Sequence, residues 1–295
     1  MAESDHGVDV AALLDLINTR HGTAFTLKRG TGLGESGASY FVTDASGEQC
    51  VLKFGFSKEF EPAQAAEFTR RLLDVGYPAP RYQLFGEAMG LKYSIQTRLP
   101  GKPWQAVTRA TLDRVLAINH LQAGLAAVPT GEPFPPWPAR VVEGVLVGFE
   151  RYCVIDSLRR HSDASAALLG TLQELVARRA GEIPAAHDIV HWDFHRGNIL
   201  TDGGRVTGVV DWEGACTGDR GFDLATYLFY SFEDIETREL LWREALECSG
   251  RSALSVYLAH MIVRQLDWSI RHHNPKMVDE QMARAEAILR ALAGV

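Results

Sequence analysis

The segment HWDFHRGNIL, residues 191–200, concentrates side chains that can do chemistry directly before a run of strand-forming residues. Within it, Asp193 carries a carboxylate that can accept a proton, and Asn198 carries an amide oxygen that can bind a cation. His191 and His195 add two rings whose charge can change near neutral pH. These residue types predict a catalytic loop, if the neighbouring elements bring the side chains together.

A β-hairpin after this loop is predicted to bring the asparagine close to a second carboxylate. The two strand-forming runs around DGGR are separated by Gly203 and Gly204, which suit a two-residue turn. In that register Asn198 lies opposite about Val209, and Asp211 follows one or two residues later. The amide oxygen, this carboxylate and the loop aspartate then form an oxygen set of the kind that Mg²⁺ binds together with phosphate oxygens and water.

Two motifs at this site resemble those of a known enzyme family. HWDFHRGN has the form H-x-D-x-x-x-x-N, and VVDWE follows with a further carboxylate. Both resemble the aminoglycoside phosphotransferase and choline kinase family, relatives of the protein kinases. The resemblance implies that Asp193 accepts the proton of the substrate hydroxyl, that Asn198 binds one metal ion and that Asp211 binds both. GDRGFDLATYL is similar to the family as well, so Asp223 is expected to brace the catalytic loop, and His191 is expected to hold the loop backbone.

The same resemblance implies a nucleotide site earlier in the chain. GTGLGESGASYFV, residues 30–42, stands where the family has a glycine-rich loop, and glycine lets backbone N–H groups approach phosphate oxygens closely. Lys53 is expected to bind phosphate oxygens, and Glu67 in the next helix is expected to pair with it, with Glu59 and Glu61 as competing candidates. YSIQTRLPG resembles the family's adenine-binding linker. The implied nucleotide-binding residues are Gly32, Gly34, Ser36, Lys53, Glu67, Gln96 and Arg98.

Three further residues have roles that the sequence leaves open. His195 stands two positions after Asp193, where protein kinases commonly carry a lysine that touches the γ-phosphate, so it is a candidate catalytic donor. Glu213 is a second metal ligand, a substrate contact or a surface charge. Asp267, in VRQLDWSIRHH, is a candidate substrate contact.

Acidic residues near the expected substrate site bear on the charge of the acceptor. As a group they favour a polycationic hydroxylated substrate, such as an aminoglycoside or a basic peptide antibiotic. The alternative is that each is an ordinary solvated charge on a helix. The residues are Glu213, Asp219, Glu233, Asp234, Glu236 and Asp267.

The pattern along the chain predicts an α+β, bilobal protein-kinase-like fold. A helix is predicted from Val10 to Arg20, and residues 25–100 are β-rich around one helix, EPAQAAEFTRRLLDVG. After the connector LPGKP, the rest is predicted to be helical except for the hairpin near residues 198–211. We therefore expect a small antiparallel sheet in a nucleotide-binding lobe, residues 1–98. A larger, mainly helical lobe, residues 99–295, is expected to carry the catalytic loop and the substrate site.

Composition excludes several other classes of protein. The 295 residues carry a net charge of −7, so no basic surface for nucleic acid or anionic membrane is expected. The four cysteines have no metal-ligand spacing and are typical of reduced thiols. The acidic N-terminus is unlike a signal peptide, and no apolar run is long enough to span a membrane. We expect a cytoplasmic monomer or homodimer whose partner is a small hydroxylated molecule.

The predicted activity is O-phosphotransfer to a small molecule. The γ-phosphate of ATP or GTP, with Mg²⁺, would move to a hydroxyl of an antibiotic and confer resistance. The alternatives are a metabolite kinase acting on an amino alcohol, sugar or amino acid hydroxyl, and a pseudokinase-like binding module without turnover. Lys53, Asp193, Asn198 and Asp211 are all present, which favours the enzyme, since a degenerate module usually loses one of them. No DFG, APE or long activation segment follows, which argues against a regulated protein kinase.

Overall fold

The computed structural model of the chain describes residues 8–30, 38–55, 60–104, 108–126, 135–150 and 152–294. Contacts within the backbone divide the chain into two compact units. The first unit consists of Met1–Trp104 and Gly197–Ala215, and the second of Gln105–Arg196 and Cys216–Val295. The predicted lobes, 1–98 and 99–295, differ from these units mainly at residues 197–215, which join the first unit because their hairpin pairs with residues 102–103.

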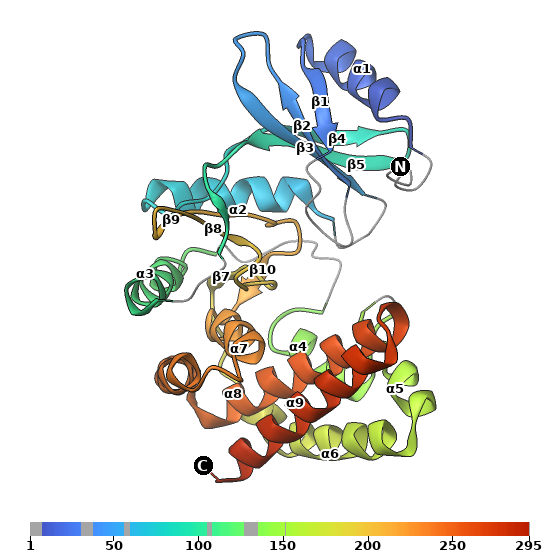
Figure 1. Ribbon diagram of the computed structural model, residues 1–295, viewed down its shortest axis with the longest axis vertical. Helices are drawn as coiled ribbons and strands as arrows, with labels where there is room; N and C mark the ends of the chain where they lie inside the picture. Colours follow the sequence, from blue (N-terminus) through green and yellow to red (C-terminus); the bar gives the residue numbers. More distant parts are fainter. Residues whose placement is uncertain are drawn as a thin grey trace. The chain divides into compact units, whose positions relative to one another are not determined.

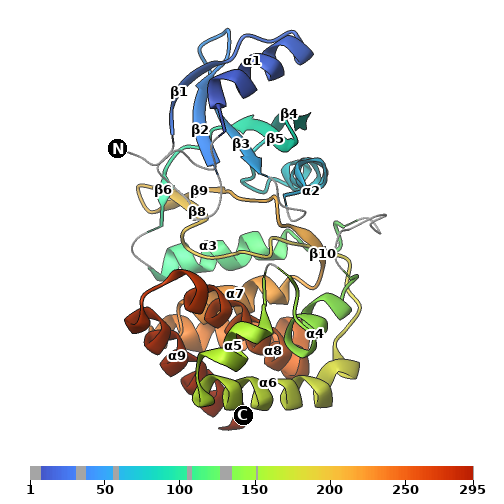
Figure 2. The same cartoon turned by 90° about the vertical axis from the view of Figure 1, so that its right-hand side faces the viewer.

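The first unit contains a five-stranded antiparallel sheet in the order β1-β2-β3-β5-β4 (Figures 1 and 2). The predicted hairpin forms from β2 and β3, and Lys53 on β3 lies opposite Ser94 on β5. Alternate residues of β3 are buried, as expected for a strand whose side chains point to opposite faces. The strands are β1 Thr26–Gly30, β2 Ala38–Thr43, β3 Gln49–Gly55, β4 Tyr82–Ala88 and β5 Leu91–Thr97.

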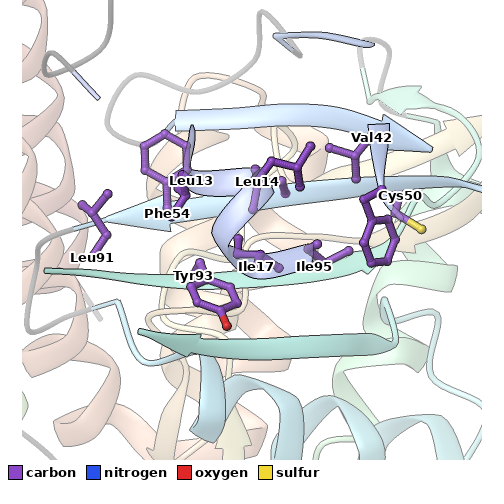
Figure 3. Close-up of a cluster of buried hydrophobic side chains, with 11 residues drawn as sticks. Leu13, Leu14, Ile17, Val42, Cys50, Phe54, Leu91, Tyr93 and Ile95 are labelled. Carbon is purple, nitrogen blue, oxygen red and sulfur yellow. The ribbon is translucent and has the colours of Figure 1, made fainter. Parts of the chain in front are cut away.

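One face of this sheet is covered by α1, Val10–His21, which confirms the predicted N-terminal helix. Asp9 caps its first turn, and Gly22, in the left-handed conformation, ends it. Figure 3 shows the cluster of buried apolar side chains that the helix and the strands share. Its residues are Leu13, Leu14, Ile17, Phe25, Val42, Cys50, Leu52, Phe54, Leu91, Tyr93 and Ile95. Because strand residues alternate between faces, Lys53 points away from this cluster.

The predicted helix between β3 and β4 is α2, Pro62–Asp74. Pro62 occupies its first turn, where a missing N–H costs nothing. The buried residues of α2 form one stripe that includes Ala65, Phe68 and Leu72. Glu67 lies outside this stripe, and its side chain is 45% exposed.

A second, three-stranded sheet in the first unit has the order β6-β8-β9. The strands are β6 Lys102–Pro103, β8 Ile199–Asp202 and β9 Arg205–Val209. Gly203 and Gly204 form the predicted two-residue turn, and both have positive φ, 54° and 78°. The predicted register was one residue off, because an irregularity between Leu200 and Thr201 shifts the pairing and places Ile199 opposite Val209.

The second unit is mainly helical. Its helices are α3 Arg109–His120, α4 Ala139–Leu146, α5 Ile155–His161, α6 Asp163–Arg179, α7 Gly221–Tyr230, α8 Ile235–His272 and α9 Pro275–Gly294, with a 3₁₀ turn at Ala180–Glu182. The prediction of helix alone in this region was wrong, since β7, Asp188–Val190, pairs with β10, Cys216–Gly218. Strands of three residues are too short to give a periodic pattern. Within the described ranges, no helix has the length and hydropathy needed to cross a membrane.

Candidate active site

In the first unit, Lys53 lies between two carboxylates. Its Nζ donates to Oδ1 of Asp211 at 2.5 Å and to Oε2 of Glu213 at 2.8 Å. The side chain of Lys53 is 15% exposed, compared with 51% for Asp211 and 5% for Glu213. The sheet and the end of β9 thus bring together two residues that the sequence assigned to phosphate and metal binding.

Glu213 is the most enclosed member of this cluster. Its Oε1 accepts a hydrogen bond from the hydroxyl of Tyr82 at 2.9 Å and one from Nε2 of Gln96 at 3.2 Å. With Lys53 as the third donor, both carboxylate oxygens are used, as a buried charge requires. Glu213 is therefore not a surface charge, and its predicted role as a substrate contact has no support from these bonds.

The charges of this cluster keep the lysine protonated. Burial alone would lower the pKa of Lys53, but the attraction of Asp211 and Glu213 outweighs burial and raises that pKa above its ordinary value. Burial and the Glu213 charge together raise the pKa of Tyr82 well above its ordinary value. Tyr82 is thus a neutral donor and Lys53 a fixed cation.

The expected ion pair between Lys53 and Glu67 is corrected by the structure. Glu67 accepts hydrogen bonds from Arg70 at 3.0 Å and from Arg71 at 2.7 Å, one turn further along α2. These bonds lower the pKa of Glu67 to about 2. Glu67 lies off the buried stripe of its helix, whereas Glu213 approaches Lys53 from the segment that follows β9.

The metal-binding pair that the sequence predicts lies at one end of the β8–β9 hairpin. Asn198 precedes β8 and its backbone oxygen accepts from the N–H of Val210, which is the residue before Asp211. Asp211 has a positive φ of 75°, which is uncommon for a residue with a side chain. In the part of the chain that the structure describes, no group of three or more His, Cys, Asp or Glu side chains could hold a metal ion. An amide oxygen and a carboxylate are donors that suit Mg²⁺, which takes water and phosphate oxygens as its other ligands.

The remaining predicted nucleotide-binding residues divide into two groups. Gly32, Gly34 and Ser36 lie outside the described residues, as does the competing candidate Glu59. Gln96 and Arg98 are described: Gln96 is buried and bonded to Glu213, and exposed Arg98 bonds to Gln49 and lies 4.3 Å from the ring centroid of Phe41. Their contacts with a nucleotide stay predictions.

In the second unit, the Asp193 carboxylate lies between an arginine and a histidine. Nη2 of Arg264, on α8, donates to Oδ1 at 2.9 Å, and Nε2 of His195 lies 3.3 Å from Oδ2. Burial alone would raise the pKa of Asp193, but the charges of Arg264 and His195 outweigh burial and hold that pKa well below its ordinary value. Asp193 is therefore an ionised acceptor at neutral pH.

The backbone of the loop is held as the sequence predicts. The Asp223 carboxylate accepts from the backbone N–H of His191 at 2.8 Å and of Trp192 at 3.0 Å, which confirms its role as a brace. Gln122 donates to the same carboxylate at 2.7 Å. Burial raises the pKa of Asp223 to about 7, against the effect of these donors. His191 is confirmed as a structural residue, since its Nδ1 accepts the N–H of Asp193.

The predicted carboxylate-lined substrate site is only weakly supported in the second unit. Asp267 is 1% exposed, and its oxygens accept from both Arg271 and Ser157. Asp219 accepts from Tyr257 and from the N–H of Gly221. Glu233 pairs with Arg284, and Asp234 caps α8. Arg271 and Arg284 offset the charges of Asp267 and Glu233, whereas Asp219 and Asp234 accept from neutral donors and keep their charge. The cationic acceptor and the contact of Asp267 with it stay predictions.

Sequence reasoning missed Arg264, Tyr82 and Gln122. Arg264 contacts a residue 71 positions away, on a helix whose sequence gives no motif. Tyr82 and Gln122 are donors to buried carboxylates, and such donors are common residue types without a spacing signal.

Comparison with known proteins shows a match to one family model and to individual kinases. The model of a family described as the phosphotransferase enzyme family matches residues 29–257. Hygromycin-B 4-O-kinase of Escherichia coli is 27% identical over 240 residues, which cover 76% of this chain and 70% of that protein. Homoserine kinase of Neisseria meningitidis serogroup B is 27% identical over 216 residues, which cover 68% of this chain and 65% of that protein.

Solved structures show the same fold. A thermostable mutant of aminoglycoside phosphotransferase APH(4)-Ia matches with a TM-score of 0.72 and 22% identity, over 95% of this chain and 99% of that chain. Another crystal of such a mutant is a ternary complex with AMP-PNP and hygromycin B, with the same TM-score of 0.72, identity and coverage. The predicted α+β, protein-kinase-like fold is confirmed.

Proposed function

The chain belongs to the phosphotransferase enzyme family, and on that premise we propose that it transfers the γ-phosphoryl group of ATP to a hydroxyl of an antibiotic. The observation that carries the proposal is the cluster of Lys53, Asp211 and Glu213 at the end of β9, next to Asn198. A fixed cation beside an exposed carboxylate suits a metal-bound polyphosphate. The match to the family model, residues 29–257, includes all four of these residues.

Phosphoryl transfer depends mainly on positioning and on neutralising charge. Lys53 would bind phosphate oxygens of the nucleotide, and Glu213 would keep its ammonium group in place. Asn198 and Asp211 would hold Mg²⁺, which supplies neutralisation of the phosphate charge when it is bound. The ammonium group of Lys53 would then exchange its bond with Oδ1 of Asp211 for a bond with a phosphate oxygen, and it would keep its bond with Glu213.

Asp193 would orient the acceptor hydroxyl and take up its proton. The carboxylate is ionised because Arg264 lies against it, so it can accept a hydrogen bond at neutral pH. A base with a low pKa is adequate here, because the proton can leave late in a loose transition state. His195, beside the same carboxylate, stays a candidate donor to the transferring group.

The antibiotic acceptor is supported by the relatives rather than by charge. Hygromycin-B 4-O-kinase matches over more of this chain than homoserine kinase does, 76% against 68%. The homoserine kinase match favours an amino acid hydroxyl as the second candidate acceptor. An antibiotic and an amino acid of this kind are both hydroxylated small molecules, so the same phosphate-binding, metal-binding and base residues would serve either acceptor.

The acceptor is tested by measuring ADP release with MgATP and a panel that contains hygromycin B, spectinomycin and homoserine. Turnover with an antibiotic, together with higher resistance of cells that express the chain, is the expected result. Turnover with homoserine alone would replace the antibiotic by a metabolite. Hydrolysis of ATP without any acceptor dependence would contradict both.

Substituting Glu213 tests which acid positions the lysine. Glu213→Gln is expected to raise the KM for MgATP about tenfold, because the Lys53 ammonium loses its buried anion. Glu67→Gln should change that KM little, since Glu67 pairs with arginines of its own helix. Steady-state kinetics at a saturating acceptor concentration measure both, and thermal unfolding checks that each variant is folded. A larger rise in this KM for Glu67→Gln than for Glu213→Gln would restore Glu67 as the partner, and an unchanged KM in Glu213→Gln would contradict the role of Glu213.

A further inference from the structure

We propose that Arg264 is a positioning residue for the base: it holds Oδ1 of Asp193 in every step and leaves Oδ2 as the oxygen that meets the acceptor hydroxyl. The inference rests on the proposed function, because it concerns how the carboxylate that acts as the base of that reaction is oriented. It concerns residues of the second unit alone, on the loop 191–196 and on α8.

The first support is the two-pronged contact of the guanidinium. Nη1 of Arg264 donates to the backbone oxygen of Trp192 at 2.7 Å, and Nη2 donates to Oδ1 of Asp193 at 2.9 Å. The arginine side chain is 19% exposed, so water competes little for these bonds. A planar guanidinium fixes the distance between its two acceptors, which a lysine ammonium cannot do. The carboxylate of the base is thereby tied to the backbone of the residue before it.

The second support is the strained backbone that the arginine stabilises. Trp192 has a positive φ of 76°, an unfavourable conformation for a bulky residue. Its N–H is bonded to Asp223 and its oxygen to Arg264, while its ring stacks on Phe222 with centroids 4.5 Å apart. The guanidinium of Arg140 lies 3.9 Å from the centroid of the Trp192 ring. Trp192, which directly precedes Asp193, is thus held at its N–H, its carbonyl oxygen and its side chain.

The third support is the difference between the two carboxylate oxygens. Oδ1 has a short bond to a shielded arginine, whereas Oδ2 lies 3.3 Å from the ring of His195, which is on the loop and 24% exposed. Because the contact of Oδ2 is the longer one, an acceptor hydroxyl can replace it more easily than the bond of Oδ1. In the described part of the second unit, the titratable groups that face Asp193 include Arg264 on α8, His191 and His195 on the loop, and Asp223 on α7. Arg264 is the permanent cation among them.

The kinetic test uses MgATP with hygromycin B as the acceptor. Arg264→Met is expected to lower kcat about 10- to 100-fold and to leave the KM for MgATP nearly unchanged. Arg264→Lys should recover only part of the loss, because one ammonium cannot hold both acceptors at the fixed spacing. The matched control is Arg284→Met, which removes an arginine of similar exposure, 18%, that pairs with Glu233. The control should keep the wild-type kcat.

A double-mutant cycle separates positioning from a general structural role. If Arg264 acts through the carboxylate, Arg264→Met has no further effect on the residual rate of Asp193→Asn. A structural role would lower that residual rate by the same factor as in the wild type. Thermal unfolding of every variant shows whether the fold itself is lost.

A second readout does not depend on activity. In protein labelled with carbon-13 at aspartate carboxyl groups, the Asp193 signal is assigned by its loss in Asp193→Asn. The wild-type signal should stay that of an ionised carboxylate from about pH 8 to about pH 4. In Arg264→Met the titration midpoint should rise by about one to three pH units, because the opposite charge is gone while burial remains.

The outcomes distinguish this inference from the proposed function. If the wild type transfers no phosphoryl group to hygromycin B or to the other acceptors, the proposed function fails, and the carboxyl titration still decides the role of Arg264. If the wild type is active but Arg264→Met keeps its kcat, the inference alone is overturned. An unchanged titration of Asp193 in Arg264→Met, or equal losses in the two backgrounds of the cycle, also overturns it.

Discussion

Replacing Asp193 with alanine is expected to lower kcat by about a hundredfold or more, while the affinity for MgATP stays nearly unchanged. The reason is that different side chains would contact the acceptor and the nucleotide. Asp193 would contact only the acceptor hydroxyl, whereas Lys53 and Asp211 would contact the nucleotide and its metal ion. The measurements are kcat with hygromycin B and a calorimetric titration with AMP-PNP and Mg²⁺.

The control for this substitution is Asp163→Ala, which removes an exposed carboxylate at the start of α6 in the same unit. Its kcat should equal that of the wild type. Full activity of Asp193→Ala would show that another group takes the proton. A large loss of nucleotide affinity in Asp193→Ala would show that this residue belongs to the metal site instead.

Replacing Asp211 with alanine is expected to have the second large effect, and a different one. The KM for MgATP should rise at least about tenfold, and kcat should fall by about a hundredfold, because the principal charged metal ligand is lost. Lys53 would keep Glu213 as its partner, so the fold of the first unit should persist. The affinity for Mg²⁺ in the presence of AMP-PNP, followed by titration, separates loss of metal from loss of fold.

Asp202→Ala is the matched control for this experiment, because Asp202 is an exposed aspartate at the turn of the same hairpin. Its kinetics should match the wild type. If the requirement for Mg²⁺ were the same in Asp211→Ala and in the wild type, Asp211 could not be the metal ligand that we propose.

The elements that carry strong local signals could be predicted from the sequence. Gly203 and Gly204 allow the positive φ angles of a tight turn, and this fixed the hairpin that places Asn198 near Asp211. The helices α1 and α2 followed from periodic apolar residues and, for α2, from Pro62. Each of these features depends on residues close together in the chain.

Features that depend on tertiary contacts could not be predicted in the same way. The spacing after Lys53 predicted Glu67 as its partner. Burial of the apolar stripe of α2 instead places that carboxylate next to arginines of the same helix. The acid that does pair with Lys53, Glu213, is 160 positions further along the chain. The acidic residues of the second unit were counted as free charges because their partners, such as Arg271 for Asp267, are visible only in the fold. Arg264 approaches Asp193 from α8 for the same reason.

The central claim, that the chain phosphorylates a small-molecule hydroxyl, is tested most directly by phosphorus NMR of the reaction products. Wild-type protein is incubated with MgATP and hygromycin B, and the same reaction is run with Asp193→Ala. We expect the γ-phosphate signal of ATP to be replaced by ADP and by an equal amount of a phosphomonoester, and we expect this conversion to be slowed about a hundredfold or more in the variant. Inorganic phosphate in place of the phosphomonoester with every hydroxylated acceptor, or equal rates for the two proteins, would contradict the account.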